Sequence, residues 1–288
     1  MGTLALRVIC PQQLPERKGT TMRVHSLISR RFLPWILSRG SMTDVSNALY
    51  RAALHSMGVD NFEPKQRDEQ LFLRKLAGRL PPDPVIFDVG ANVGQYARMV
   101  RKAMPGARIF SFEPGPAAFE RLKVAKIGGA FVPIQAALGA IDGETVLFDF
   151  KEPAGSPHAS LIPGVIEEFR GADAQEIKVA AVTLDAFARH RSIDKIDLLK
   201  IDVEGAELRV LQGAGEMIAA RRIQVLQIEM TENNLLSRTF FRDIAAILPD
   251  HHFYRILRNG DLLDLSGKRP LAVEIFGYQN LVALPRLP

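Results

Sequence analysis

Short apolar segments alternate with segments of helical periodicity along most of the chain, and this alternation limits the possible folds more than any other feature. Strands that are apolar throughout and joined by helices are typical of βαβ units, in which a parallel sheet is covered on both faces. The sequence therefore predicts an α/β fold with a doubly wound, mostly parallel sheet. The predicted strands are 85–89, 107–112, 130–138, 196–201, 223–228, 253–257 and 274–283, and the predicted helices are 95–104, 116–126, 206–219 and 235–248.

Two regions depart from this alternation. Apolar residues at helical spacing predict two helices within residues 45–80, which would form an N-terminal helical cap before the main domain at 81–288. The segment 140–183 is predicted to be an insertion, with two strands around a loop at 153–163 that is rich in Gly, Ser and Pro. We expect this loop to be mobile and to lie beside the functional site.

The net charge of +5 is concentrated at the beginning of the chain. Residues 1–45 contain seven basic and two acidic residues, so the remainder is formally neutral. The main domain therefore has no charge bias toward nucleic acid, and no nucleic-acid partner is expected. We interpret residues 1–44 as a basic, disordered leader.

The single cysteine, Cys10, excludes an intramolecular disulfide and a cysteine zinc cluster, and is compatible with the reducing cytoplasm, where we expect the protein to act. No segment approaches the ~20 apolar residues that a transmembrane helix needs. The leader also lacks the long apolar run and cleavage site of a secretory signal.

A glycine-rich turn, Asp88-Val89-Gly90-Ala91-Asn92-Val93-Gly94, joins the first predicted strand to the first helix. Glycine allows tight backbone geometry there, and the start of the helix offers free N–H groups to a ligand. Glu113 ends the second strand, 19 residues after Gly94. An acidic residue at about this distance accepts hydrogen bonds from ribose hydroxyls in dinucleotide-binding folds, so the spacing predicts a nucleoside cofactor.

The residues of this turn favour S-adenosylmethionine over NAD. Asn92 stands where dinucleotide-binding folds place glycine, and the Asp88 carboxylate would repel a pyrophosphate but can engage the amino-acid end of S-adenosylmethionine. An NAD-linked oxidoreductase and a non-catalytic cofactor-binding protein remain the alternatives.

Three ionisable residues, Lys200, Asp202 and Glu204, alternate at the end of the predicted strand 196–201 and would share one side of it if it stays extended. Ligands bind at such strand ends, next to the point where the strand order reverses. We predict that these residues are catalytic together with His158, with Asp202 or His158 as the general base. No bound metal is predicted. The alternatives are that Asp202 caps the next helix, or that Asp202, Glu204 and Glu229 hold a divalent cation.

Five motifs occur in order along the chain: Phe87–Gly94, Phe112-Glu113-Pro114, Ala137-Leu138-Gly139, Thr183-Leu184-Asp185, and Leu199–Glu207 followed by Gly213-Ala214. With these motifs the chain resembles the FkbM-type methyltransferase family. This resemblance implies a Rossmann-like class I methyltransferase with a seven-stranded sheet, S-adenosylmethionine as cofactor, and a hydroxyl of a sugar, lipid or secondary metabolite as acceptor. It also implies that Asp88, Gly90, Asn92 and Gly94 line the methionine end of the cofactor, Glu113 its ribose, and Ala136 and Ala137 its adenine.

Replacing Glu113 with alanine should weaken the binding of S-adenosylmethionine. The variant loses one or two charge-assisted hydrogen bonds to the ribose, each contributing about 1.5–3 kcal/mol. Isothermal titration calorimetry measures the change. An unchanged affinity in a folded Glu113→Ala protein would contradict the assignment of Glu113 to the ribose.

Overall fold

The computed structural model describes residues 33–60, 67–152 and 154–286, which fall into two units, one ending at His55 and the other beginning at Ser56. The described part of the first unit contains two helices and a short 3-10 turn, and most of the predicted leader lies outside the described residues. Within the predicted leader, residues 33–37 and 40–42 are helical. No helix among the described residues is long and apolar enough to cross a membrane. The elements of this unit are α2 (Leu33–Leu37), η2 (Gly40–Met42) and α3 (Thr43–Ser56).

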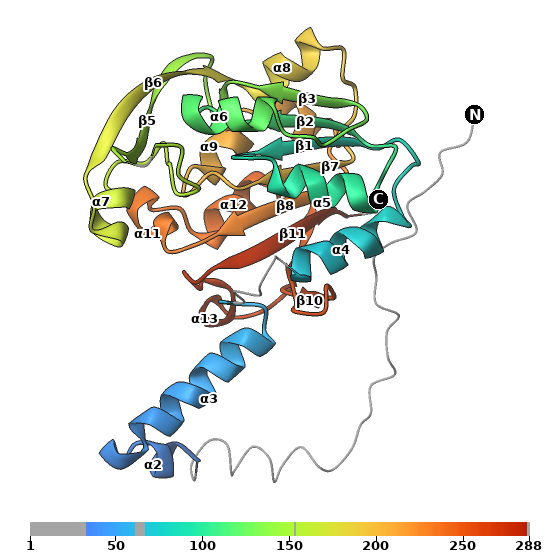
Figure 1. The fold of residues 1–288 in the computed structure, drawn as a ribbon. Helices are drawn as coiled ribbons and strands as arrows, with labels where there is room; N and C mark the ends of the chain where they lie inside the picture. The colour runs from blue at the N-terminus through green and yellow to red at the C-terminus, as the bar shows by residue number, and fades with distance from the viewer. Residues whose placement is uncertain (1–32, 61–66, 153, 287–288) are drawn as a thin grey trace. The chain divides into compact units, whose positions relative to one another are not determined.

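The second unit is built on a large twisted sheet with the strand order β10-β9-β11-β8-β7-β1-β2-β3 (Figure 1). The five strands from β3 to β8 in this order are parallel, and β11 runs antiparallel to both its neighbours. The predicted fold class is confirmed, although the short edge strand β10 makes eight strands where seven were predicted. The strands are β1 (Val85–Val89), β2 (Arg108–Phe112), β3 (Phe131–Ile134), β7 (Leu198–Ile201), β8 (Leu226–Met230), β9 (His251–Ile256), β10 (Leu262–Asp264) and β11 (Gln279–Pro285).

The strand order reverses between β1 and β7. From β1 the chain first adds β2 and β3 on one side, and later adds β7 and β8 on the other. In open α/β sheets the crevice at such a reversal, outside the carboxyl ends of the strands, is where ligands bind. The sequence therefore placed the segment after β7 correctly at the reversal point.

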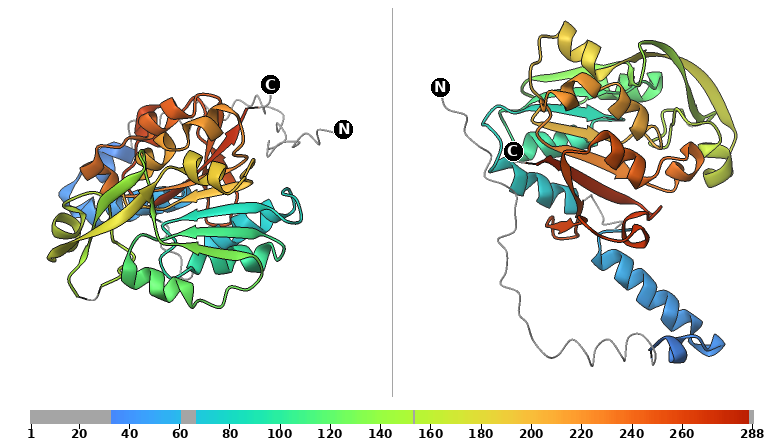
Figure 2. Two further views of the ribbon diagram at one scale, coloured as in Figure 1. Left: turned by 90° about the horizontal axis from the view of Figure 1, so that it is seen from above. Right: turned by 180° about the vertical axis from the view of Figure 1, so that it is seen from behind.

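Helices cover both faces of the sheet (Figures 1 and 2). The two faces differ in the chemistry of their side chains. Phe87, Phe112 and Ile201 belong to a largely apolar face that packs on α8, α9, α10 and α12. The alternate residues, Asp88 and Lys200 among them, point to the opposite face, where α4 and α5 supply Glu69 and Tyr96. The helices of this unit are α4 (Arg67–Ala77), α5 (Gln95–Ala103), α6 (Pro116–Lys123), α7 (Val165–Arg170), α8 (Leu184–His190), α9 (Glu207–Gln212), α10 (Gly215–Ala219), α11 (Asn233–Ser237), α12 (Phe241–Ile247) and α13 (Pro270–Val273).

Three predicted elements are divided. The strand predicted at 130–138 is interrupted after Ile134, and its second part, β4 (Ala137–Leu138), joins another sheet. The helix predicted at 206–219 breaks at Gly213, where the backbone approaches the Gly139 carbonyl so closely that a Cβ would overlap it. The helix predicted at 235–248 is likewise divided into α11 and α12. Helices α7 and α8 were not predicted.

The insertion forms a small three-stranded sheet in the order β4-β6-β5, with β5 (Gly143–Phe150) antiparallel to β6 (Ala174–Val182). The loop that follows β5 is fastened at both ends. Asp149, which is buried, accepts hydrogen bonds from the backbone N–H groups of Phe150 (2.8 Å) and Gly155 (2.6 Å). Further along, Ser160 pairs with Phe148 through two backbone hydrogen bonds. The mobility of this loop remains a prediction, but its path is fixed by these contacts.

Gly90 gives a direct test of how closely β1 and β7 approach at the reversal point. Its φ is +85°, and a Cβ would overlap the Asp202 carbonyl group. We expect Gly90→Ala to lower the free energy of unfolding by at least about 3 kcal/mol, measured by chemical denaturation. Gly139→Ala is the control, because a Cβ there meets nothing within 4 Å, and it should change stability by less than about 1 kcal/mol. Equal effects of the two substitutions would show that this close approach is not a constraint.

Candidate active site

A pocket opens at the carboxyl ends of β1, β2 and β7, below the loop that follows β5. It brings together most of the residues predicted to bind the cofactor and two of those predicted to be catalytic. Among its lining residues are Gly90, Asn92, Glu113, Ala136, Ala137, Asp202 and Glu204, together with Ser156, Pro157, Ala159 and Leu161 of the loop. Four other predicted residues do not line the pocket. They are Asp88, Gly94, His158 and Lys200.

The turn after β1 is shaped by left-handed backbone conformations. Asn92 has a φ of +44°, which asparagine tolerates better than most residues, and this explains how it replaces glycine. Its Nδ2 donates to the Ser156 carbonyl at 3.2 Å, so the turn contacts the loop above the pocket. Gly94, with a φ of +78°, starts α5 and packs against Leu122 and Ile127 rather than lining the pocket.

Glu113 holds two turns together. Its buried carboxylate accepts hydrogen bonds from the backbone N–H groups of Asn92 (2.8 Å) and Gly115 (2.7 Å). Burial nevertheless raises the pKa of Glu113 to about 7, because desolvation outweighs these hydrogen bonds. Glu113 therefore shapes the Asn92 turn and also presents a carboxyl group to the pocket.

A row of polar residues crosses the centre of the sheet on the face covered by α4 and α5. Ser111, Asp88, Lys200 and Gln227 are register partners on the adjacent parallel strands β2, β1, β7 and β8. Ser111 Oγ donates to Asp88 at 2.9 Å, and burial raises the pKa of Asp88 to about 7. Such a row is unusual inside a parallel sheet, where both faces are normally apolar.

Lys200 is the centre of this polar row. Its side chain is only 2% exposed, and its Nζ lies 3.1 Å from Glu229, 3.1 Å from Asn280, 3.6 Å from Glu69 and 3.7 Å from Asp202. Burial acts to lower the pKa of Lys200, but the surrounding carboxylates outweigh burial and hold it well above its ordinary value. Burial likewise raises the pKa of Glu229. Lys200 is therefore a buried cation surrounded by carboxyl groups, of which only Asp202 reaches the pocket.

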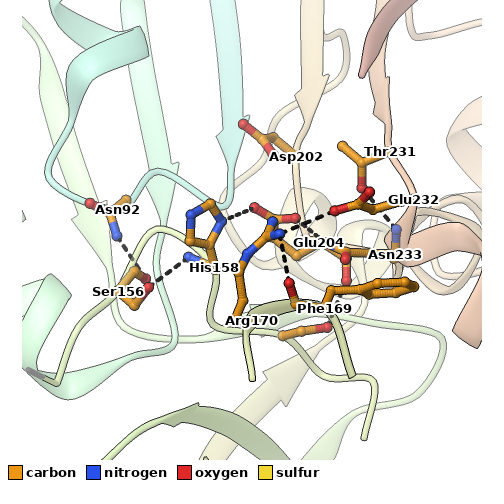
Figure 3. Close-up of polar contacts among 12 residues, drawn as sticks. Asn92, Ser156, His158, Phe169, Arg170, Asp202, Glu204, Thr231, Glu232 and Asn233 are labelled. Atoms are coloured by element: carbon orange, nitrogen blue, oxygen red, sulfur yellow. Dashed lines mark hydrogen bonds and ion pairs between the residues drawn. The ribbon is translucent and has the colours of Figure 1, made fainter. Parts of the chain in front are cut away.

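Glu204 links the segment after β7 to the loop and to α11 (Figure 3). Its φ of +52° is unfavourable for a glutamate, and such strain is concentrated at functional sites. Its Oε1 lies 3.4 Å from His158 Nδ1, its Oε2 accepts a hydrogen bond from Asn233 Nδ2, and its carbonyl oxygen accepts one from Ser160 Oγ at 2.6 Å. These contacts bring His158 and Glu204 together, although they are 46 residues apart in sequence.

Glu207 also stabilises the segment that follows β7. Its buried carboxylate accepts hydrogen bonds from the Gly205 N–H (2.9 Å) and from Asn234 Nδ2 (2.7 Å), and burial raises its pKa to about 7. Helix α9 begins at Glu207 after Ala206, with no side chain capping it, so the alternative that Asp202 caps this helix is wrong.

The described residues contain no group of three His, Cys, Asp or Glu side chains that could hold a metal ion. Glu229, one of the three ligands in the cation alternative, is instead hydrogen-bonded to Lys200 at 3.1 Å. Resistance of turnover to a chelator is therefore the expectation that best fits this arrangement.

Sequence reasoning missed several members of the site. Glu69 was not singled out, although it shares a helix face with Phe72, Leu73 and Leu76, and an acid on an apolar helix face is a recognisable signal. Asn233 begins α11, three residues after the end of β8, and functional residues lie beyond the carboxyl ends of strands in such sheets. Gln227 and Asn280 lie within strands and gave no such signal.

The pocket lining fits S-adenosylmethionine, whose sulfonium carries a positive charge. Three carboxyl groups, those of Glu113, Asp202 and Glu204, line the pocket, and none of its described lining residues is Lys or Arg. Opposite charges attract strongly in a partly desolvated pocket. Gly90 also lines the pocket.

Comparison with known proteins identifies the family. Residues 88–256, more than half of the 288-residue chain, match the family described as Methyltransferase FkbM domain. Methyltransferase sdnD of Sordaria araneosa is 31% identical, over 48% of this chain and 62% of its own length. Hexuronic acid methyltransferase AglP of Haloferax volcanii is 26% identical, over 56% and 63%. The 2-O-methyltransferase NoeI of Sinorhizobium fredii is 31% identical, over 58% and 72%.

The chain thus spans slightly less than two thirds of the length of sdnD and AglP. The family match begins at Asp88 in the glycine-rich turn and ends at Ile256 in β9, so it contains the pocket-lining residues but not α4. It also decides between the two cofactors that the sequence left open, in favour of the methyl donor. The chain belongs to the FkbM family of S-adenosylmethionine-dependent methyltransferases.

Proposed function

We propose that this protein methylates a hydroxyl oxygen of a sugar, a lipid or a secondary metabolite in the cytoplasm. The observation that carries the proposal is that Gly90, Asn92 and Glu113, predicted to bind the cofactor, line the same pocket as Asp202 and Glu204. The names of two relatives, a hexuronic acid methyltransferase and a 2-O-methyltransferase, support a hydroxyl acceptor.

The chemistry sets two tasks for the residues of the pocket. When bound, S-adenosylmethionine supplies a methyl group on a positively charged sulfur. The protein must hold the acceptor oxygen in line with that bond, and must take up the hydroxyl proton as the new bond forms. Alignment can contribute several kcal/mol, and a positioned base contributes about 10²–10⁴-fold in rate.

His158 is the base that the contacts favour. If its Nδ1–H faces the Glu204 carboxylate, Nε2 carries the lone pair that can accept a proton, and the imidazolium that forms is stabilised by the neighbouring negative charge. The His158 side chain is 41% exposed, so an acceptor can reach it. Asp202 is the second candidate, but its carboxylate also interacts with Lys200 at 3.7 Å. In this proposal Glu204 orients His158 and Asp202 holds the acceptor.

The acceptor class is testable without knowing the acceptor. The protein is incubated with cell extract and S-adenosylmethionine carrying a deuterated methyl group, and the glycan, lipid and small-metabolite fractions are analysed by mass spectrometry. The label should appear in a methyl ether of one of these fractions. Label found only in nucleic acid or on nitrogen would contradict the proposal, and no label in any fraction would favour a non-catalytic protein.

With the labelled acceptor in hand, two substitutions identify the base. His158→Gln should lower kcat by about 100-fold or more while leaving the affinity for S-adenosylmethionine unchanged. His252→Gln is the matched control, since His252 is exposed on β9, and it should leave kcat unchanged. If Asp202→Asn causes the larger loss and His158→Gln retains most of the activity, the base is Asp202 instead.

A further inference from the structure

Helix α4 contributes a carboxyl group to the polar cluster beneath the pocket. Glu69 is 1% exposed, and its Oε1 lies 3.6 Å from Lys200 Nζ. The helix precedes the segment 88–256 that matches the family, so the family match assigns no role to Glu69.

Glu69 is held in place from a second direction. Gln227 Nε2 donates to Glu69 Oε1 at 2.6 Å, and Gln227 in turn accepts a hydrogen bond from the Tyr96 hydroxyl at 2.7 Å. Residues of α4, β8 and α5 therefore fix the position of one carboxyl group. Burial raises the pKa of Glu69, which shows that its charge is costly where it lies. Apolar residues usually stabilise a core at least as well as buried ions, so stability alone does not explain this acid.

The ammonium group of Lys200 interacts with several carboxylates at once. Glu69, Glu229 and Asp202 all lie within 4 Å of the Lys200 ammonium. Of these, Asp202 is 33% exposed and lines the pocket, whereas the other two side chains are buried behind it. A change in the interaction of Lys200 with one of these carboxylates therefore changes the charge that Asp202 presents to the pocket.

We propose that Glu69 is a positioning residue of the cofactor site. It draws Lys200 away from full pairing with Asp202, so that Asp202 presents negative charge to the pocket where the cationic cofactor binds. Without the charge of Glu69, Lys200 neutralises Asp202 more completely, and the pocket loses part of its preference for a positive ligand. The proposal rests on the cofactor pocket alone and is independent of which hydroxyl is methylated.

The test compares two ligands of nearly the same shape whose net charges differ by one. S-adenosylmethionine and S-adenosylhomocysteine differ by one methyl group and the sulfonium charge, and both are titrated calorimetrically into the wild type and into Glu69→Gln. Glutamine can still accept the hydrogen bond from Gln227, so the substitution removes mainly charge. We expect S-adenosylmethionine to bind about three- to tenfold more weakly to Glu69→Gln, and S-adenosylhomocysteine to change by less than about twofold.

A matched control separates this effect from a loosened helix. Asp261→Asn removes the charge from the ion pair between Lys75 of α4 and Asp261 (2.6 Å), an exposed contact of the same helix, and should leave both affinities unchanged. An equal loss for both ligands in Glu69→Gln, or no change for either, overturns the proposal.

A second variant covers the case in which Glu69→Gln does not fold. Glu69→Asp keeps the charge but withdraws the carboxylate from Lys200. The ratio of the two affinities should then shift in the same direction by a smaller factor, and an unchanged ratio in the folded Glu69→Asp protein would likewise overturn the proposal.

Discussion

The buried ammonium of Lys200 is the constraint on which the surrounding structure depends. A cation in the middle of a parallel sheet is tolerated only when carboxylates and other acceptors surround it. The chain meets this requirement with Glu229 from β8, Glu69 from α4 and Asn280 from β11. The need to compensate this one charge explains why this face of the sheet is polar and why the helices that cover it supply polar side chains.

The two faces of the sheet have different roles in the molecule. The apolar face, on which Phe87, Phe110 and Phe112 pack around Phe187 of α8, contains ordinary hydrophobic core. The polar face leads to the pocket, and burial there raises the pKa of carboxyl groups that would otherwise be fully ionised. Perturbed groups of this kind are characteristic of functional sites, and the apolar face supplies the stability that lets the fold retain them.

Much of the fold and part of the site followed from local sequence patterns. β1 was predicted with its observed bounds, and β2, β7 and β9 within two residues, because apolar runs between helices report burial directly. The break after Ile134 was not predicted, because 130–138 was assigned to one strand from its apolar residues although Gln135 is polar. Pairing with β6 places Ala137 and Leu138 in the other sheet. The grouping of His158 with Glu204 is invisible in sequence, because it depends on the path of the loop after β5. Glu69 was missed for a different reason: the helical pattern was used to find the apolar face, and the acid on that face was not weighed.

The partners of Lys200 come from nearly the whole length of the second unit, from Glu69 near its start to Asn280 in the last strand, β11. Contacts between such distant residues form late, because long loops must close before they are made. A chain emerging from the ribosome can fold β1, α5 and β2 and expose a nearly finished glycine-rich turn. Lys200, however, still lacks its partner Asn280 until β11 is synthesised and inserted between β8 and β9. Competence to bind the cofactor is thereby coupled to the insertion of β11 between β8 and β9.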